Sequence, residues 1–136
     1  METIYVVAAI IKDGNRIFAT QRGYGAFKDY WEFPGGKLEA NERPEEALRR
    51  EIKEELDTEI QVGEYLTTIE YNYPEFHLSM RCYWAEVLEG TLVLKEHEAA
   101  KWLGMDELED VAWLPADEKI INLIKKYIAK DTPQLI

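Results

Sequence analysis

The sequence predicts an α/β fold in which a mixed β-sheet lies between helices. Segments typical of strands stand on both sides of one helical segment, and a second amphipathic helix comes near the end of the chain. The chain has 136 residues, which suits one domain, and no repeat or long linker divides it. We therefore expect a single domain over residues 1–136.

Residues 3–11 and 16–21 are expected to form the first two strands. The first is an apolar run that is too short to span a membrane and is typical of a buried strand. Turn-forming residues at 12–15 separate it from the second segment, in which apolar and polar side chains alternate. Residues 23–30 are rich in glycine and aromatic side chains and are expected to form a loop.

Residues 44–56 are expected to form the first helix. Leu48, Ile52 and Leu56 repeat every four residues and give this segment one apolar face. Arg43, the residue before it, is a weak N-cap compared with serine, threonine, aspartate or asparagine. The apolar face can pack on the sheet while the acidic face of the same helix borders a cleft.

The next part of the chain is expected to be a hairpin followed by short strands. Residues 59–71 and 77–87 are rich in β-branched and aromatic side chains, and turn-forming residues at 72–75 join them. Residues 92–95 and 101–103 are expected to add two short strands to the sheet.

Residues 117–130 carry isoleucine and leucine at helical spacing, so we expect a second amphipathic helix there. The last residues, 131–136, include a proline and are expected to be loosely held.

The composition is that of a globular protein with an excess of negative charge. The formal net charge is −11, which repels nucleic acid polymers and anionic membranes, so we expect neither as a partner. No apolar run reaches the length of a membrane span, and the N-terminus has no basic leader. Cys82 is the single cysteine and is expected to pack in the core, which fits a reducing cytoplasm.

Aromatic and histidine side chains give no separate functional signal. The tryptophans are expected to belong mostly to the core; they are Trp31, Trp84, Trp102 and Trp113. His77 and His97 are too few and too far apart to form a metal site of their own, so we assign them no chemistry.

Three acidic residues of the first helix point to a metal site. Glu51, Glu54 and Glu55 stand at i, i+3 and i+4, so they project from one face within a single turn. Like charges at this spacing destabilise a helix slightly, whereas Mg²⁺ favours carboxylates together with substrate phosphates. The alternative is a solvated glutamate-rich helix, in which Arg50 pairs with Glu54 at i+4.

The residues around this helix resemble a known signature. Gly36, Glu42 and the run 50–55 (Arg-Glu-Ile-Lys-Glu-Glu) stand at the spacing of the Nudix box, and residues 31–37 (Trp-Glu-Phe-Pro-Gly-Gly-Lys) resemble its entry in the MutT-type branch. Two positions depart from the pattern: Asp57 stands where the family usually has glycine, and Thr58 where it has a bulky aliphatic residue. The resemblance implies the Nudix fold, an α/β/α sandwich on a mixed sheet.

The resemblance also implies an activity. Relatives of this type hydrolyse nucleoside or deoxynucleoside triphosphates to the monophosphate and pyrophosphate, with Mg²⁺ and with Mn²⁺ as a substitute. We therefore expect an enzyme that removes oxidised dGTP or modified cytidine triphosphates. Two alternatives stay open: a Nudix domain that senses a nucleotide without cleaving it, and a hydrolase of another nucleoside diphosphate derivative. The sequence leaves monomer and homodimer equally open.

The resemblance implies a set of metal ligands. They are the carboxylates of Glu51, Glu54 and Glu55, the backbone carbonyl of Gly35, and Glu96 from a distant loop. Glu96 has a competitor in Glu98, and a solvated loop acid is an alternative for it. Which glutamate acts as general base stays open. Arg50 is expected to hold the carboxylates through charge-assisted hydrogen bonds.

The resemblance further implies which residues contact the nucleotide. Arg22 and Lys37 are candidates for contacting the phosphates, and the alternative for each is an ordinary surface cation. Phe33 is expected to line the base pocket, and the backbone near Phe76 to reach a base edge. Asp117 matches a position that hydrogen-bonds the base, and its alternative is the N-cap of the second helix.

Overall fold

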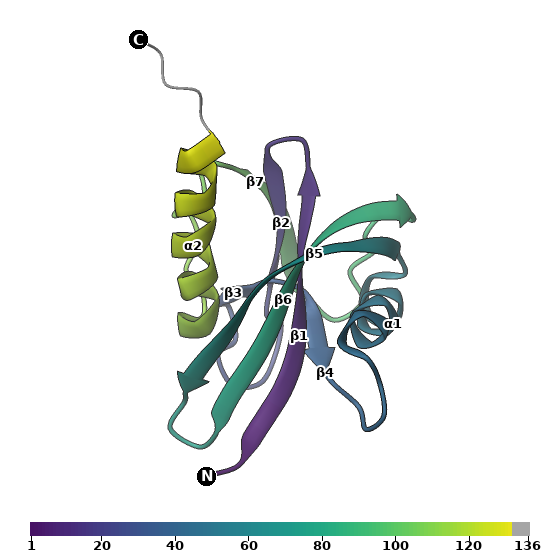
Figure 1. Cartoon of the computed structure of the whole chain (residues 1–136), viewed down its shortest axis with the longest axis vertical. Helices are drawn as coiled ribbons and strands as arrows, with labels where there is room; N and C mark the ends of the chain where they lie inside the picture. The colour runs from purple at the N-terminus through teal and green to yellow at the C-terminus, as the bar shows by residue number, and fades with distance from the viewer. Residues whose placement is uncertain (132–136) are drawn as a thin grey trace.

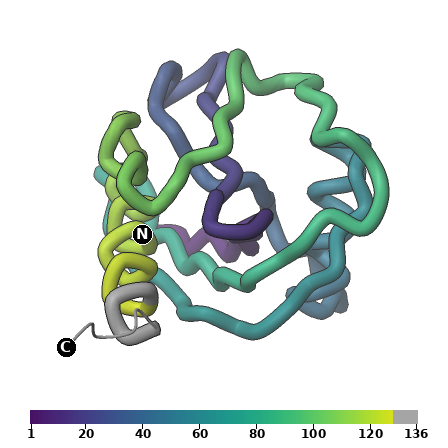
Figure 2. The backbone as a smooth tube through the Cα atoms, turned by 90° about the horizontal axis from the view of Figure 1, so that it is seen from above, coloured from purple at the N-terminus to yellow at the C-terminus, as the bar shows by residue number. Residues whose placement is uncertain are grey.

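Two helices cover opposite faces of a seven-stranded sheet, α1 (Pro44–Leu56) and α2 (Pro115–Asp131) (Figure 1). The structure is a computed structural model, and it describes residues 1–131 of the chain. Seen from above, α1 and α2 again lie on opposite sides of the strands (Figure 2). The predicted α/β/α sandwich is thus confirmed, while the prediction that all 136 residues form one domain stays a prediction.

The sheet is mixed, as expected. Its main path runs β3-β2-β1-β6-β5, with β4 paired to β1 and β7 paired to β2. Strands β1 and β6 are parallel neighbours, and the remaining pairs are antiparallel. The strands are β1 (Thr3–Asp13), β2 (Arg16–Gln21), β3 (Trp31–Glu32), β4 (Gly35–Lys37), β5 (Glu59–Asn72), β6 (His77–Glu89) and β7 (Ala99–Gly104).

Strand β1 separates two hydrophobic cores. Because successive strand residues point to opposite faces, Ala8 and Ile10 belong to the core beneath α2, and Val7, Ala9 and Ile11 to the core beneath α1. All five side chains are buried. Apolar residues on both faces explain why this strand reads as an unbroken apolar run.

Helix α1 has the bounds that the sequence predicts, and its apolar face is buried against the sheet. Arg43 makes no side-chain hydrogen bond as N-cap, as expected of a weak cap. The helix ends at Asp57, whose φ of 48° and ψ of 43° place it in the left-handed conformation that glycine often adopts there. The neighbouring Thr58 is buried, and its hydroxyl donates to the carbonyl of Leu56 and accepts from the N–H of Leu92.

The predicted strand at residues 92–95 is wrong. Leu92 has a φ of 55°, which is incompatible with an extended strand. The N–H groups of Leu92 and Val93 bond instead to Thr58 and Leu56, so this segment is fixed to the end of α1. The sequence also missed β3 and β4, whereas the expected strand at 101–103 is confirmed within the longer β7.

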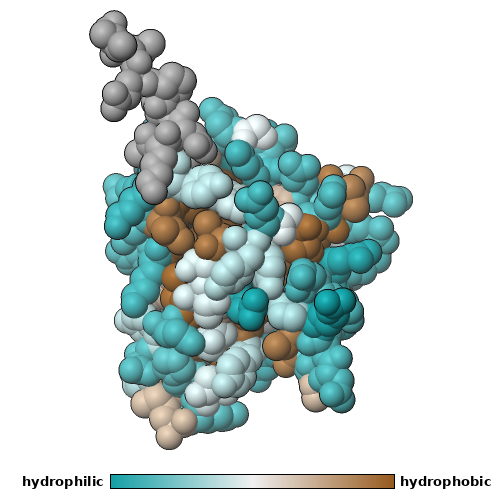
Figure 3. Space-filling view, viewed as in Figure 1, coloured by the Kyte–Doolittle hydropathy of each residue, from teal (hydrophilic) through white to brown (hydrophobic). Residues whose placement is uncertain are grey.

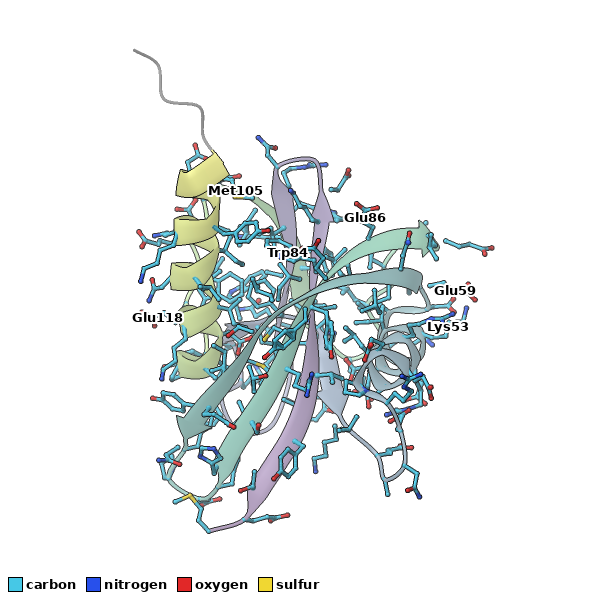
Figure 4. All side chains as sticks on the ribbon, viewed as in Figure 1. Lys53, Glu59, Trp84, Glu86, Met105 and Glu118 are labelled. Atoms are coloured by element: carbon cyan, nitrogen blue, oxygen red, sulfur yellow. The ribbon has the colours of Figure 1, made fainter. Side chains whose placement is uncertain are left out.

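Helix α2 begins at Pro115, two residues before the predicted start. Asp117 therefore lies inside the first turn, and its interpretation as the N-cap is wrong. Glu118 points away from the sheet (Figure 4). Residue 131 is helical rather than loosely held, and the rest of the predicted tail, 132–136, lies outside the described residues.

The tryptophans divide into two groups. Trp31 and Trp113 are buried, whereas Trp84 and Trp102 are half-buried. The ring of Trp84 lies 5.8 Å from that of Tyr127 on α2, centre to centre. Cys82 is fully buried in the core beneath α2, as predicted.

Hydrophilic residues cover most of the face shown in Figure 3, with apolar side chains visible between them. Within residues 1–131, no helix is both long enough and apolar enough to cross a membrane.

Candidate active site

A cavity of about 690 Å³ opens where β1, β4 and α1 meet the loops that follow β2 and β6. Its wall has two chemically different parts. We call the part formed by Glu51, Glu55 and Glu96 the carboxylate side. We call the part formed by four aromatic rings and one buried acid the aromatic side; its members are Phe27, Phe33, Tyr73, Phe76 and Asp117.

All but two of the predicted site residues line this cavity. Those that do are Arg22, Phe33, Gly35, Lys37, Glu51, Glu55, Phe76, Glu96 and Asp117. The two exceptions are Arg50 and Glu54, which lie on α1 but do not line the cavity. The side chain of Glu54 is 60% exposed, so the structure does not turn all three helix glutamates into the same space.

Glycine is required at positions 35 and 36 of β4 because neighbouring atoms lie very close to the backbone there. A Cβ atom at Gly36 would collide with the carboxylate of Glu51, and one at Gly35 would collide with the carbonyl oxygen of Val7. These contacts bring the backbone of β4 directly against both β1 and α1. The carbonyl of Gly35 and the carboxylate of Glu51 therefore belong to one compact region.

Arg50 joins the neighbouring acidic residues. Its Nε and Nη2 atoms donate to both carboxylate oxygens of Glu42, at 2.7 and 2.9 Å. Its Nη1 donates to Glu51 at 2.9 Å and to Glu54 at 3.2 Å, and Nη2 also reaches the carbonyl of Lys37. These contacts raise the pKa of Arg50 above its ordinary value and lower the pKa of Glu42.

Glu42 is a site residue that the sequence analysis quoted as part of a spacing but gave no role. The paired hydrogen bonds from Arg50 show what it does locally: it orients the guanidinium that holds Glu51 and Glu54. Its fixed place in the signature was the signal that pointed to it.

Glu55 carries the least compensated charge on the carboxylate side. Burial, followed by the negative charges of Glu51, Glu32, Glu96 and Glu54, raises its pKa to about 7. Burial also raises the pKa of Glu51, but the hydrogen bond and charge of Arg50 oppose that shift. The two neighbours on one helix are thus in different electrostatic surroundings, because Arg50 contacts only one of them.

The loop after β6 supplies Glu96 and not Glu98 to the cavity. The carboxylate of Glu96 accepts a hydrogen bond from the hydroxyl of Tyr24 at 3.1 Å. Glu98 lies 3.7 Å from the ammonium of Lys28, and its N–H donates to the carbonyl of Gln21. The structure therefore separates the two candidates that the sequence left in competition.

His97 also lines the cavity, although the sequence analysis assigned it no chemistry. Its Nε2 atom lies 3.9 Å from a carboxylate oxygen of Glu55. Its Nδ1 atom is buried and has no hydrogen-bond partner among the described residues. Burial lowers the pKa of the ring, against the opposing charges of Glu32 and Glu96. Its position next to Glu96 was the single signal in the sequence.

The aromatic side is built around a buried acid. Asp117 is 4% exposed, and its Oδ1 accepts a hydrogen bond from the N–H of Phe33 at 3.0 Å. Burial raises the pKa of Asp117 to about 8. The Tyr73 ring stacks on Phe76 at 5.2 Å, and the Tyr73 hydroxyl accepts from the N–H of Ala116. Asp117 is therefore held against the backbone at the edge of an aromatic cluster.

Arg22 stands between the two sides. Its Nε and Nη2 donate to both oxygens of Glu32, at 3.0 and 3.1 Å, and this pairing raises its pKa. Its Nη1 donates to the carbonyl of Ala26. The charge of Arg22 also acts on Asp117. Lys37 lines the cavity with an exposed side chain.

The donor atoms of the carboxylate side suit a hard divalent cation, which favours carboxylate and carbonyl oxygens. The residues described by the structure include no group of three or more histidine, cysteine, aspartate or glutamate side chains that already has metal-binding geometry. Burial is the largest cause of the raised pKa of Glu55, and an excess of negative charge from Glu51, Glu32, Glu96 and Glu54 raises it further. A cation would relieve that excess, so the residues present fit a divalent ion.

Fold and site together define the class of this protein: it is a hydrolase with an α/β/α fold and an acidic helix beside a cavity. The chain belongs to the NUDIX family, because the model of the NUDIX domain matches residues 1–124. Enzymes of this family use a divalent metal ion.

Named relatives agree with this assignment. The chain is 35% identical to CTP pyrophosphohydrolase of Escherichia coli K12 over 130 residues, which cover 95% of this chain and 94% of that protein. It is 32% identical to 8-oxo-dGTP diphosphatase of the same strain over 128 residues, which cover 93% and 99%. The crystal structure of MutT NUDIX hydrolase from Burkholderia pseudomallei shares the fold, with a TM-score of 0.83, 24% identity and coverage of 91% and 99%.

Proposed function

We propose that the protein hydrolyses nucleoside or deoxynucleoside triphosphates, with Mg²⁺, to a nucleoside monophosphate and pyrophosphate. One observation carries the proposal: a single cavity holds a carboxylate side for a metal-bound phosphate chain and an aromatic side for a base. The names of two relatives, CTP pyrophosphohydrolase and 8-oxo-dGTP diphosphatase, support a role in removing modified cytidine triphosphates or oxidised dGTP.

The carboxylate side would hold the metal through Glu51, Glu55, Glu96 and the carbonyl of Gly35, with Glu54 at its margin. A divalent ion in such a site neutralises phosphate charge and lowers the pKa of a bound water; Mn²⁺ would substitute for Mg²⁺. Arg50 keeps Glu51 and Glu54 in place through its hydrogen bonds. The reaction consumes one water, breaks one phosphoanhydride bond and releases both products.

The phosphates need positive contacts as well, because acidic side chains outnumber basic ones among the residues that line the cavity. Lys37 is exposed at the cavity beside the glycine turn, so it can contact a phosphate as a mobile point charge. Arg22 is fixed by Glu32, so it offers a guanidinium of set orientation. We propose that both residues face the phosphate chain or the sugar.

The base would lie on the aromatic side. Phe33 and Phe76 supply ring surface, and Asp117 supplies the one buried polar side chain among them. Its Oδ1 is already occupied by the Phe33 N–H, so the second oxygen is the atom that can read a base edge. A carboxylate accepts from the amino group of cytosine or guanine, and a protonated carboxyl also donates.

The test is turnover of a panel of natural and oxidised nucleotides, ranked by kcat/KM, with wild type, Glu54→Gln and Glu55→Gln. We expect wild type to release monophosphate and pyrophosphate, and both variants to lose about 100-fold or more of kcat while keeping the wild-type fold. Reaction in ¹⁸O-labelled water shows which phosphorus is attacked.

Full activity in both variants would defeat the proposal. If wild type binds nucleotides but releases no product, the proposed hydrolysis is wrong and the protein is a nucleotide sensor. Release of a different product from a nucleoside diphosphate derivative would identify the second alternative.

We also propose a location and an assembly state. The single buried cysteine fits a cytoplasmic enzyme. Its assembly state is proposed as either a monomer or a homodimer.

A further inference from the structure

Among the carboxylates that line the described cavity wall, Glu55 and Glu39 accept no hydrogen bond, and Glu39 is 67% exposed whereas Glu55 is only 28% exposed. Glu51 accepts from Arg50, Glu32 accepts from Arg22, and Glu96 accepts from Tyr24. Within the described residues, no side chain or backbone group donates a hydrogen bond to Glu55. The one basic side chain that approaches it is His97, whose Nε2 lies 3.9 Å from Glu55 Oε2.

The surroundings of the His97 ring favour a hydrogen bond from its Nε2 atom to the Glu55 carboxylate. The His97 side chain is 10% exposed, so it is enclosed by the cavity wall rather than solvated. Its Nδ1 has no partner among the described residues, so a proton on that atom would be buried and unpaired. A proton on Nε2 faces an acceptor instead. The surroundings therefore favour the form of the ring that carries hydrogen on Nε2.

We propose that His97 is a positioning residue that donates a hydrogen bond from Nε2 to Glu55 and fixes the orientation of that carboxylate. The proposal rests on the proposed hydrolase function. The 3.9 Å separation is longer than a hydrogen bond, and contacts of this kind are often long before substrate binds and shorten in the substrate complex. A hydrogen bond to a charged acceptor is stronger than a neutral one, and partners of metal-binding carboxylates orient them in this way.

The first experiment measures by NMR which nitrogen of the His97 ring carries the proton, and it does not depend on enzyme activity. The chain has two histidines, so long-range ¹H–¹⁵N spectra of their rings are simple, and the variant His77→Gln assigns them. We expect a proton on Nε2 of His97, and a shift of that signal in Glu55→Ala. The matched control is Glu54→Ala, one residue away on α1, which should leave the signal unchanged because Arg50 holds Glu54.

The second experiment compares His97→Gln with His97→Asn. Glutamine places an amide N–H near the position of Nε2, whereas asparagine places it near Nδ1. We expect His97→Gln to stay within about 3-fold of wild type, and His97→Asn to lose about 10–100-fold in kcat or in metal affinity, as outer partners of metal ligands do. Nucleotide KM and the unfolding temperature should be similar in both variants, and His77→Gln should match wild type.

Several results would overturn the proposal. A neutral His97 ring with its proton on Nδ1, or an equal response to Glu55→Ala and Glu54→Ala, would contradict the hydrogen bond. Equal activity in the glutamine and asparagine variants would show that the ring only fills space. If wild type cleaves no nucleotide, the proposed function fails, whereas the ring spectra still decide whether His97 bonds to Glu55.

Discussion

The two sides of the cavity are stabilised by different physical means. On the carboxylate side, the charge of Glu51 is compensated by one guanidinium, that of Arg50, and the charge of Glu55 remains poorly compensated. On the aromatic side, rings pack against one another and Asp117 is buried with a single backbone donor. The structure of the carboxylate side depends on charge compensation. The structure of the aromatic side depends on ring packing and on the protonation of Asp117. Substitutions should therefore affect turnover on the first side and substrate choice or stability on the second.

The largest effect is expected from removing the guanidinium. Arg50→Met removes the side-chain donor of Glu51 and leaves Glu42 with the backbone N–H of Glu39 alone, so we expect kcat/KM to fall about 100-fold. Arg50→Lys keeps the charge but not the forked geometry and should recover only part of the loss. Steady-state kinetics at saturating Mg²⁺ measure both variants, with Arg49→Met as the exposed neighbour control. Near wild-type kinetics in Arg50→Met would show that charge compensation does not control this side.

A smaller and different effect is expected on the aromatic side. Asp117→Asn keeps the shape of the side chain but replaces the reading oxygen with an amide, so the ratio of kcat/KM between cytosine and guanine substrates should change by about 10–100-fold. The Mg²⁺ concentration at half-maximal rate should stay within about 3-fold of wild type, because the residue is not a ligand. Glu118→Gln, on the outer face of α2, is the control. An unchanged base preference would mean that Asp117 is structural only.

The same acid should make stability depend on pH. The folded protein keeps a proton on Asp117 up to about pH 8, whereas the unfolded chain releases it near pH 4. The folded state therefore binds more protons in this window, so stability is highest at its acidic end and is lost as pH rises through 8. Between pH 6 and pH 9, wild type should lose on the order of 2–3 kcal/mol more than Asp117→Asn. Urea unfolding at both pH values measures this; equal losses would contradict the buried, protonated state.

The smallest effect is expected far from both sides, at the end of α1. Asp57 adopts the left-handed conformation, so Asp57→Gly should stabilise the fold by about 0.5–1 kcal/mol. Thermal unfolding measures the change, and kcat/KM should not move. Altered turnover in this variant would show that the position of α1 is not rigid, and that the two sides are coupled through it.

The same contrast governs how much could be predicted from the sequence. Two of the three members of the carboxylate side, Glu51 and Glu55, lie on one helix, and their spacing follows from the pitch of that helix. Helix α1 was predictable to its last residue because Leu48, Ile52 and Leu56 mark one face. The strands β3 and β4 were not, because two or three residues carry no periodicity and are defined by backbone pairing with β2 and β1.

The aromatic side depends on contacts between distant residues, which no local pattern encodes. Asp117 accepts a hydrogen bond from the N–H of Phe33, which is 84 positions away in the sequence. Asp117 was expected as the N-cap of the second helix, but it is a buried acid inside the first turn of α2. His97 was missed for a related reason: its importance comes from the proximity of Glu55 on another element. Leu92 was expected in a strand because its side chain is apolar, but the hydroxyl of Thr58 captures its N–H.

Cys82 has a practical consequence. Its thiol is fully buried, and burial raises its pKa, so very little of the nucleophilic thiolate forms at neutral pH. A cysteine introduced at an exposed position such as Leu88, whose exposure is 62%, would therefore be the one thiol that a maleimide dye modifies readily. The native chain thus accepts a single fluorescent label without prior removal of its own cysteine.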